Sequence, residues 1–545
     1  MSFTGGRPQP GGGAGMSFTG GRPQLGGGAG MSFTGGGPQL GGGAGMSFTG
    51  GGPQGEGSPG PRVAVVGGGL AGLAAAVAVA DGGAAVTLYE RAPRLGGATW
   101  SFRRNGRWFD NGQHVFMRCC TEYRAFLGRL GVDDLVVQQR RLSVPVIGPG
   151  CRPARIFRTG APAPLHLARS LMGYKPLSVA DRLRAVRTAL ALRRLDPDHP
   201  DTDGLSFGEW LRSRGESDQA VGGLWDLICL PTVNLRADDA SLSLAVKVFR
   251  TGLLDAADAA DLGWTRVPLA ALHGDAATRV ITARGGSIQL GARVEAVSEG
   301  PSVTVGGQRV DHDAVILAVP HDAVDGLLPP GTVPGQAGLA GLGVSPIVNV
   351  HFVFDRPVMD IPLAAALDSP IQFVFDRTEA AIWGGDGSDA LGRDDRGEGS
   401  DAPPGTRGRG ERVAPTGTRG EQVVAVSQSA AFDEIGDRPD EMIERYRLAL
   451  CDLFPRAAEA EVVDAVVTRE HRATFAGRPG TRRLRPGPTT AMSGLFLAGA
   501  WTDTGWPATM EGAVRSGHRA ARLALEHYRR VPPATSPVKI QKVTA

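Results

Sequence analysis

The chain has 545 residues and 41% of them are hydrophobic, so it can bury a substantial core and form two domains or one large two-part enzyme. Its 58 basic residues nearly balance its 55 acidic residues, which gives no case for binding nucleic acid. Its five cysteines lack the CxxC spacing of metal sites and redox pairs, so we expect no metal and a reducing, cytoplasmic setting. No basic and apolar leader is evident, so we also expect no secretory signal.

Two stretches are predicted to be disordered, because they have too few apolar side chains to form a packed core. Residues 1–54 repeat a glycine-rich unit that begins MSFTGG, and residues 384–421 contain the tetrapeptide GTRG twice. The first stretch is predicted to be an N-terminal extension, and the second an insertion in a surface loop.

The folded part begins with an uncharged run, VAVVGGGLAGLAAAVAVA, from Val63 to Ala80. Its length would suit a membrane span, but it contains several glycines and few large apolar side chains. We predict instead a buried strand, a glycine turn and a helix. A second apolar strand, Ala85–Glu90, completes the β-α-β order of a dinucleotide-binding fold.

Further along the chain, the period of the apolar residues distinguishes helices from strands. Residues 155–266 are predicted to be mainly helical, as are residues 439–453. Strands are predicted within 294–319 and at 347–354, 371–375 and 423–427, and a last strand, turn and helix lie within 495–517. This order predicts an α/β fold, in which a Rossmann-like doubly wound domain is interrupted by an α+β substrate domain.

The glycine turn after the first strand satisfies the pattern G-x-G-x-x-G with Gly67, Gly69 and Gly72. The first glycine allows the tight turn, the second lets a pyrophosphate approach the backbone, and the third lets helix and strand pack closely. Glu90 ends the second strand, where its carboxylate can accept hydrogen bonds from a ribose hydroxyl and repels a 2′-phosphate. The sequence therefore predicts a dinucleotide other than NADP.

Two segments resemble the flavin-binding elements of the amine oxidase and carotenoid desaturase superfamily. The first is RAPRLGG, which contains Arg91, Arg94, Gly96 and Gly97, and the second is LFLAGAWTDTGWPATMEG near the C-terminus. The resemblance implies FAD as the cofactor and adds three residues to its predicted contacts, namely Gly499, Asp503 and Met510. The chain departs from the superfamily pattern at two positions, since Ala98 replaces a basic residue and Ala500 replaces an acid.

With this cofactor, the chain is predicted to divide into seven segments. In chain order they are the disordered repeats 1–60, the first FAD-binding part 61–150, the mainly helical part 151–285 that faces the substrate or the membrane, the FAD-domain strands 286–330, the substrate-domain β part 331–470 with its disordered insertion 384–421, the second FAD-binding part 471–528 and the disordered tail 529–545.

A narrower resemblance, to the hydroxysqualene dehydroxylases, rests on FDNGQHV at 109–115 and on WTDTGWPATMEG at 501–512. It implies a polyprenoid substrate, with reductive removal of the hydroxyl of hydroxysqualene to give squalene, a precursor of hopanoids. Two alternatives stay open. One is a carotenoid or phytoene-type desaturase, and the other is a flavin-free protein of the same fold that binds prenyl lipids.

Removing a hydroxyl needs a proton donor, and the candidates are His114, Asp503 and Glu511. Each also has a structural interpretation. His114 could bond a backbone carbonyl, Asp503 could cap the last helix, and Glu511 could lie in the first turn of that helix.

One helical segment carries arginines beside an apolar side formed by Leu183, Val186 and Leu190; the arginines are Arg182, Arg184, Arg187, Arg193 and Arg194. Such a helix could rest on anionic lipid and give a peripheral contact with the membrane. It could equally be an ordinary amphipathic helix with a solvated basic face. The sequence leaves this choice and the oligomeric state open.

Overall fold

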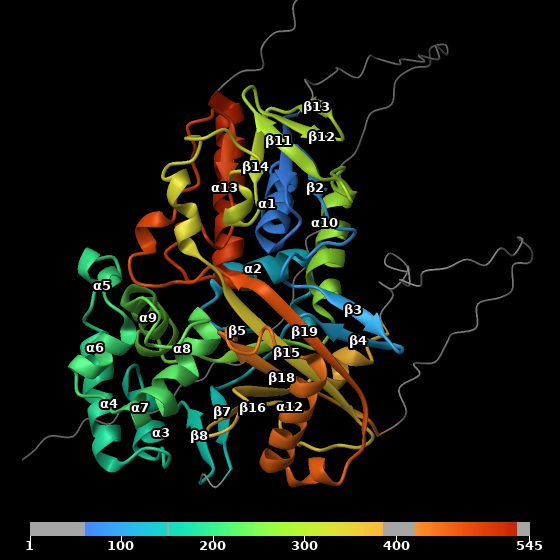
Figure 1. The fold of residues 1–545 in the computed structure, drawn as a ribbon. Coiled ribbons are helices and arrows are strands. Elements are labelled where there is room, and N and C mark those ends of the chain that lie inside the picture. Colours follow the sequence, from blue (N-terminus) through green and yellow to red (C-terminus); the bar gives the residue numbers. More distant parts are fainter. Residues whose placement is uncertain (1–59, 150–151, 385–419, 531–545) are drawn as a thin grey trace, which may run out of the picture. The chain divides into compact units, whose positions relative to one another are not determined.

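The computed structural model describes residues 60–149, 152–384 and 420–530 (Figure 1). The repeats, the low-complexity insertion and the C-terminal tail for which we predicted disorder lie outside these residues, apart from a few residues at their edges. The architecture is the mixed α/β fold that the order of elements predicts.

A five-stranded parallel sheet forms the first layer, in the order β10-β2-β1-β14-β20. Distant parts of the chain supply these strands, and most of their side chains are buried, as expected for a parallel sheet covered on both faces. Their bounds are Arg62–Val66 for β1, Ala85–Glu90 for β2, Ser287–Leu290 for β10, Ala314–Leu317 for β14 and Leu495–Leu497 for β20.

Helix α1 (Leu70–Asp81) packs against the sheet and against the last helix, α13 (Met510–Arg530) (Figure 1). Ten of the twelve residues of α1 are buried, which explains why it is built of alanine, valine, leucine and glycine. The uncharged run 63–80 is therefore a buried strand, turn and helix, as predicted. None of the helices within the described ranges is long and apolar enough to cross a membrane.

Two further helices border this layer, namely α2 (Thr121–Leu130), which contacts α13, and α10 (Ala276–Ala283), which contacts α1 and α2. Smaller sheets are attached to it. One has two strands, β3 (Ser101–Arg104) and β4 (Arg107–Asp110). A second has the order β5 (Val115–Met117), β9 (Leu262–Thr265) and β6 (Val136–Gln138). A third has the order β11 (Val294–Ser298), β12 (Ser302–Val305) and β13 (Gln308–Asp311).

A seven-stranded mixed sheet, in the order β19-β15-β18-β17-β16-β7-β8, forms the second layer. Helix α12 (Pro439–Leu453) covers one face of it with an apolar cluster that includes Val350, Phe352 and Tyr446. The strands are β7 (Ser143–Ile147), β8 (Ala154–Phe157), β15 (Ser345–Phe354), β16 (Leu363–Ala366), β17 (Phe373–Asp376), β18 (Gln422–Ser429) and β19 (Val462–Thr474), and the short helix α11 (Thr378–Ala381) follows β17.

The predicted helix 439–453 and the predicted strands 347–354 and 423–427 are confirmed as α12, β15 and β18, and β17 begins two residues inside the predicted strand 371–375. The sequence missed β19, a strand of 13 residues. Its side chains are mixed and mostly half-buried because it lies at a sheet edge, so no continuous apolar run marks it.

The predicted helical stretch is confirmed as a group of short helices beside the second sheet (Figure 1). The helices are α3 (Ala168–Met172), α4 (Val179–Leu192), α5 (Pro200–Gly204), α6 (Phe207–Ser213), α7 (Asp218–Ala220), α8 (Asp226–Val233) and α9 (Leu242–Phe249), with π-helical turns at Val221–Trp225, Arg250–Leu254 and Ala270–Asp275. Ser178 caps α4 and Ser206 forms a capping box with Glu209 at α6. The predicted domain boundaries stay a prediction.

Gly517 gives a test of the packing between α1 and α13. A Cβ atom there would lie 2.2 Å from the backbone oxygen of Ala71, so the two helices would have to separate. Gly517→Ala should lower the free energy of unfolding by about 1–3 kcal/mol, which a thermal melt measures.

Gly128→Ala is the matched control, because Gly128 lies in α2 and a Cβ there would meet no atom within 4 Å. Alanine at that position should be neutral or stabilising. Equal destabilisation by the two variants would contradict the close contact of α1 with α13.

Candidate functional site

The turn after β1 has a shape that only glycines permit. Gly67 has φ +107°, and a Cβ atom there would lie 2.5 Å from the backbone oxygen of Ala318. A Cβ at Gly72 would lie 1.8 Å from the oxygen of Gly67, so the start of α1 can approach the turn only without a side chain. Gly69 is the N-cap of α1, and no side chain caps this helix end. The free N–H groups of the first turn are therefore left for an anion.

Glu90 stands beside this turn at the carboxyl end of β2. Its carboxylate accepts hydrogen bonds from the backbone N–H groups of Gly68 (2.6 Å) and Ala92 (2.7 Å). These bonds fix the acid at the edge of the turn, where each oxygen keeps a second lone pair for another donor. The contact with a ribose hydroxyl stays a prediction.

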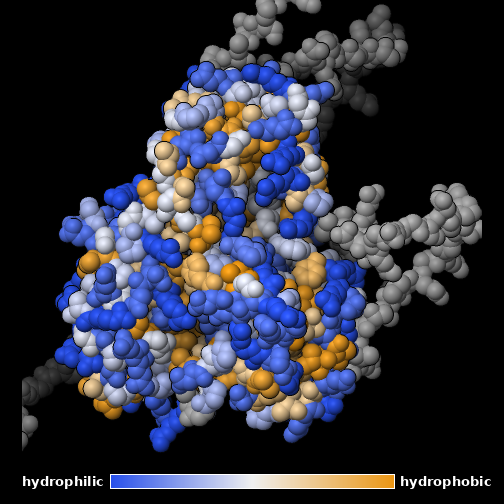
Figure 2. Space-filling model, in the orientation of Figure 1, coloured by the Kyte–Doolittle hydropathy of each residue, from blue (hydrophilic) through white to orange (hydrophobic). Residues whose placement is uncertain are grey.

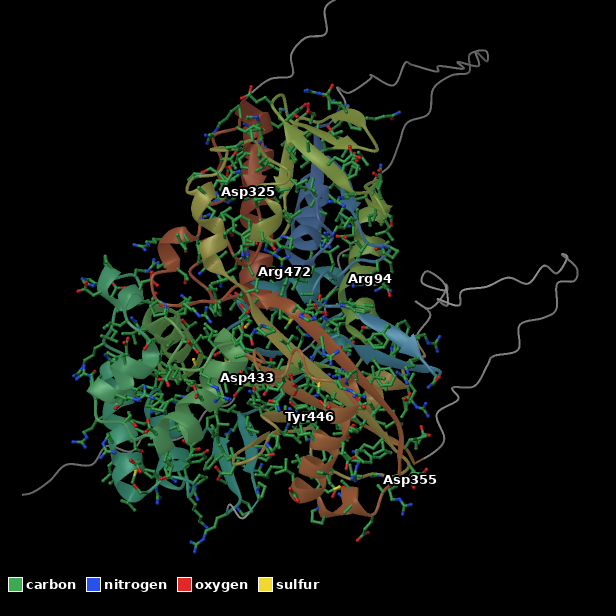
Figure 3. The ribbon with its side chains drawn as sticks, viewed as in Figure 1. Arg94, Asp325, Asp355, Asp433, Tyr446 and Arg472 are labelled. Carbon is green, nitrogen blue, oxygen red and sulfur yellow. The ribbon has the colours of Figure 1, made fainter. Side chains whose placement is uncertain are left out.

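The loop that follows β2 returns to the same turn. The N–H of Gly96 donates to the oxygen of Gly68 at 2.9 Å, and Gly97, with φ +58°, lies so close to Gly69 that a Cβ would be 2.8 Å from its Cα. The structure therefore brings the predicted glycines of both segments together with Glu90. Arg91 is exposed, and Arg94 stacks over the ring of Trp100 at 3.7 Å, near the β3–β4 hairpin (Figure 3).

A buried series of hydrogen bonds holds this loop in place. The Thr99 hydroxyl donates to the oxygen of Gly96 (2.9 Å), and the two ring nitrogens of His273 meet the hydroxyls of Thr99 (3.1 Å) and Tyr123 (2.9 Å). Burial lowers the pKa of His273 to about 3, so its ring is neutral at ordinary pH. Sequence reasoning missed His273, because a single histidine within a helical stretch gives no signal.

The C-terminal segment is held by groups that are also buried. The N–H of Gly499 donates to the Ser516 hydroxyl at 2.8 Å, and the indole of Trp501 donates to the oxygen of Val319 at 2.8 Å. Arg485 donates to three successive backbone oxygens, those of residues 500, 501 and 502, at 3.1, 3.2 and 2.6 Å. Burial lowers the pKa of Arg485 to about 10. Sequence reasoning missed this role of Arg485, because the residue lies ten positions before the recognised motif.

Helix α13 begins at Met510, and the Thr509 hydroxyl accepts the N–H of Gly512 at 3.2 Å. Thr509 is therefore the cap of this helix, and the interpretation of Asp503 as its cap is wrong. Asp503 instead accepts the N–H of Gly505 at 3.2 Å, within the turn that precedes the helix.

Glu511 lies in the first turn of α13, as its structural interpretation predicts, and is fully buried. Its carboxylate accepts the N–H groups of Glu122 (3.2 Å) and Tyr123 (2.8 Å) at the start of α2, and it pairs with Arg515 at 2.6 Å. Every bond found for Glu511 uses it as an acceptor, which makes it a link between two helices.

His114 is half-buried and lines a small cavity with Gln113, Val115, Trp264, Pro362, Phe375, Asp376 and Arg377. One ring nitrogen, Nδ1, lies 3.1 Å from the oxygen of Gly112, and burial lowers the pKa of His114 below its usual value. No hydrogen bond or ion pair joins His114, Asp503 and Glu511 to one another within the described ranges. The three candidates therefore do not form one cluster.

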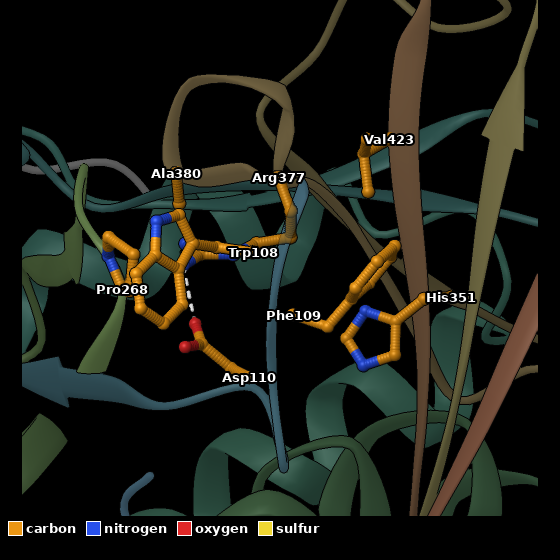
Figure 4. Close-up of a pocket in the computed structure, with 8 residues that line it drawn as sticks. All are labelled: Trp108, Phe109, Asp110, Pro268, His351, Arg377, Ala380 and Val423. Carbon is orange, nitrogen blue, oxygen red and sulfur yellow. Dashed lines mark hydrogen bonds and ion pairs between the residues drawn. The ribbon is translucent and has the colours of Figure 1, made fainter. Parts of the chain in front are cut away.

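A second cavity adjoins the first at Arg377 (Figure 4). Arg377 and Asp110 form a buried ion pair at 2.8 Å there, and His351 lies beside the ring of Phe109. Burial lowers the pKa of His351 to about 4. The cavity is lined by Trp108, Phe109, Asp110, Pro268, His351, Arg377, Ala380 and Val423.

Asn111, from the NGQHV motif, connects the glycine loop to the second sheet. Its side chain accepts the N–H of Trp100 and donates to the oxygen of Ala98 (2.9 Å) and to Glu470 (2.8 Å) on β19. Its backbone oxygen accepts from Asn349 (3.2 Å) on β15 and from Thr468 on β19. The motif thus fixes the loop at 96–100 relative to the seven-stranded sheet.

These residues fit a flavin dinucleotide. The glycine turn, the uncapped start of α1 and Glu90 form the cradle for a pyrophosphate and ribose that doubly wound folds present at the carboxyl ends of their strands. The segment from Gly499 extends from β20, next to β14 in the same sheet. The molecule has the class of site found in FAD-binding enzymes.

The chain belongs to the flavin containing amine oxidoreductase family, whose model matches residues 70–525. It is an FAD-dependent oxidoreductase, as the two flavin segments predict. A hydroxysqualene dehydroxylase of Rhodopseudomonas palustris is 27% identical over 478 residues, covering 85% of this chain and 98% of that protein. A zeta-carotene desaturase of Zea mays is 25% identical and covers 85% and 83%. An oxidoreductase of Methanosarcina mazei has a similar fold, with a TM-score of 0.61 and 19% identity over 85% of this chain and 100% of that one.

Gly97 gives a test of the cradle. Gly97→Ala places a Cβ against Gly69 and so should push the two glycine loops apart. We expect at least about a tenfold loss of FAD affinity, from the loss of about 1.4 kcal/mol of binding, measured by titrating the apoprotein with FAD and following flavin fluorescence.

The matched control is Gly291→Ala, because Gly291 has φ +68° but no atom within 4 Å of its Cβ position. It carries similar backbone strain, but its Cβ does not meet a neighbouring loop. If Gly291→Ala lowered the affinity for FAD as much as Gly97→Ala does, backbone strain and not the close approach of the loops would explain the loss.

Proposed function

We propose that this enzyme reduces hydroxysqualene to squalene. The observation that carries the proposal is the match to a hydroxysqualene dehydroxylase along 85% of this chain and 98% of that protein. A second support is the NGQHV motif, whose Asn111 fixes the flavin loop on the substrate sheet. The product would serve hopanoid or triterpenoid synthesis.

The reaction balances as one protonation and one hydride transfer. The substrate hydroxyl takes a proton, the carbon–oxygen bond breaks, water leaves with the proton, and the allylic carbon is left as a delocalised cation. Reduced FAD supplies a hydride when bound, which brings the two electrons of the new carbon–hydrogen bond. The protein has to bind the hydrocarbon, exclude water from the cation and supply the proton.

A continuous apolar cluster suits the hydrocarbon. It includes Trp225 and Phe249 from the helical group, Leu363 from the second sheet, and Trp501 beside the C-terminal flavin segment. Side chains of this kind offer no nucleophile and no bound water to a cation. Because a polyprenoid dissolves in bilayers and not in water, the proposal includes contact with a membrane surface.

Among the three candidate donors, we assign the proton to His114. Glu511 already accepts three hydrogen bonds that join α13 to α2 and to Arg515, and Asp503 bonds a backbone N–H in its own turn. His114, in contrast, borders a cavity beside Phe375 and Trp264. With Nδ1 bonded to Gly112, the other ring nitrogen is free to hold the proton for the substrate oxygen. Burial favours loss of that proton, which makes the charged ring a stronger acid.

A carotenoid-type desaturase is the second candidate, because the zeta-carotene desaturase of Zea mays matches at 25% identity. The fold and FAD site would serve both reactions. They differ in direction, since a desaturase removes hydrogen from its substrate and the proposed enzyme adds it.

Product analysis separates these functions. The purified protein with FAD, reduced chemically without oxygen, should convert hydroxysqualene to squalene, detected by gas chromatography and mass spectrometry. Phytoene with an electron acceptor should give no new double bond. The Gly97→Ala variant is the control for flavin dependence. Desaturated phytoene without any squalene would contradict the proposal and establish the second candidate.

The pH dependence tests His114. Since the pKa of His114 lies below 6.5 and the acid acts in its protonated form, turnover should rise as the pH falls below 6.5 and be lost as the pH rises through the lowered pKa. His114→Gln should lose at least about a hundredfold in kcat, together with this acidic limb, and should keep its FAD. The exposed His471→Gln is the control. A His114→Gln enzyme with the normal rate and profile would exclude the assignment.

A further inference from the structure

Helix α4 has its polarity reversed relative to an ordinary surface helix. Its outward residues Val179, Leu183 and Leu190 are 59%, 49% and 43% exposed. At about 100° per residue, these three and Val186 fall within an arc of about 60°. The opposite side, which is buried, is formed by small or mixed residues, namely Asp181, Ala185, Thr188 and Leu192. An apolar stripe therefore faces away from the protein.

Neighbouring residues extend this stripe. Met172, at the end of α3, is 41% exposed, and its backbone oxygen accepts a hydrogen bond from Arg182 of α4, which places it beside the first turns of that helix. Leu165, just before α3, is 62% exposed. Of the twelve exposed large apolar side chains in the described ranges, five fall within residues 165–190. We call Met172, Val179, Leu183, Val186 and Leu190 the apolar stripe.

The same segment is strongly basic. Residues 165–195 contain seven arginines and lysines and a single acid, Asp181, which is buried and paired with Arg184 at 2.7 Å. On the helical wheel, Arg187 and Arg194 lie about 50–70° from the middle of the stripe on one side, and Arg182 and Arg193 lie about 50–70° from it on the other. Arg187 and Arg194 are exposed, and no ion pair is found for either within the described ranges. Cations therefore flank the apolar residues on both sides. In Figure 2, apolar and hydrophilic surface lie side by side where Figure 1 places α3 and α4.

We propose that the apolar stripe, with its flanking arginines, is a docking surface for a bilayer that contains anionic lipids. Apolar side chains enter the boundary between headgroups and acyl chains, and the arginines on either side meet the lipid phosphates. A second copy of the chain is a poor occupant, because a symmetric contact would bring two rows of arginines together. No described helix could span the membrane, so the contact is one of lying on the surface.

This surface is joined to the interior. Ala185 and Leu192, on the inner side of α4, belong to the same apolar cluster as Trp225 and Trp501. Docking would thus place the bilayer at one end of an apolar region that reaches the flavin segment. The inference rests on the proposed function only in that a polyprenoid substrate gives the enzyme a reason to visit a bilayer.

Vesicle sedimentation of the FAD-loaded protein tests the proposal. Binding should be strong to vesicles of phosphatidylcholine with phosphatidylglycerol, weaker to phosphatidylcholine alone, and lower at high salt. Leu183→Asp combined with Leu190→Asp should lower the partition coefficient at least about tenfold. Arg187→Gln combined with Arg194→Gln should lower it about fivefold for each cation removed, and only on the anionic vesicles.

Two controls match these changes in type. Leu448→Asp alters an exposed leucine of α12, 51% exposed, and Arg293→Gln alters an exposed arginine of the loop after β10. Neither should change vesicle binding. Turnover on substrate presented in detergent should be the same for all variants, which shows that the fold and the active site are intact.

The outcomes are distinct. The proposal is overturned if the stripe variants bind vesicles as well as the unaltered protein does. It is also overturned if the protein is a dimer that the stripe variants convert to a monomer without any loss of vesicle binding. Vesicle binding needs no substrate, so an enzyme that binds through the stripe and makes no squalene would reject the proposed function alone.

Discussion

The close approach of two backbone loops is the constraint on which the rest of the site depends. The turn after β1 and the loop after β2 meet where Gly97 lies against Gly69 with no room for a Cβ atom on Gly97, and Glu90 bridges both through backbone N–H groups. A single methyl group at this contact would separate the start of α1 from the loop. Because α1 also packs on α13, the position of the C-terminal segment follows from the same contact.

Buried polar side chains connect this contact to the seven-stranded sheet and to the C-terminal segment. Asn111 bonds the glycine loop to β15 and β19, and His273 bonds the Thr99 hydroxyl of that loop. Arg485 donates to three carbonyl groups of the C-terminal segment. Each of these groups is matched with partners, and a matched buried network costs little while it fixes one arrangement. The cavities beside His114 and Arg377 are lined in part by the second sheet, with His351 from β15 and Phe375 from β17.

Apolar side chains gather in two places, the buried apolar cluster and the exposed apolar stripe. The cluster is buried and includes side chains of the helical group, the second sheet and the C-terminal segment, whereas α4 turns a second set of apolar side chains outward, where arginines flank them. Exposed apolar area of this kind is unfavourable in water, and it is typical of a surface that a partner covers. For an enzyme whose substrate dissolves in lipid, a bilayer is the partner that also delivers the substrate.

The sequence by itself determined the local elements and the cradle. The period of apolar residues gave β1, α1, β2 and α12, because their burial follows directly from the chain. The glycines could be assigned because the tight turn needs them, and Glu90 because a carboxylate at the end of the second strand suits a ribose hydroxyl. Only the tertiary structure decided the roles of His273, Arg485 and Thr509. It also showed that Asp503 does not cap α13 and that Glu511 links two helices. These roles depend on how the chain folds around each residue. The direction in which the stripe of α4 faces was decided in the same way, because a helix pattern defines an apolar side but does not say which side the rest of the protein covers.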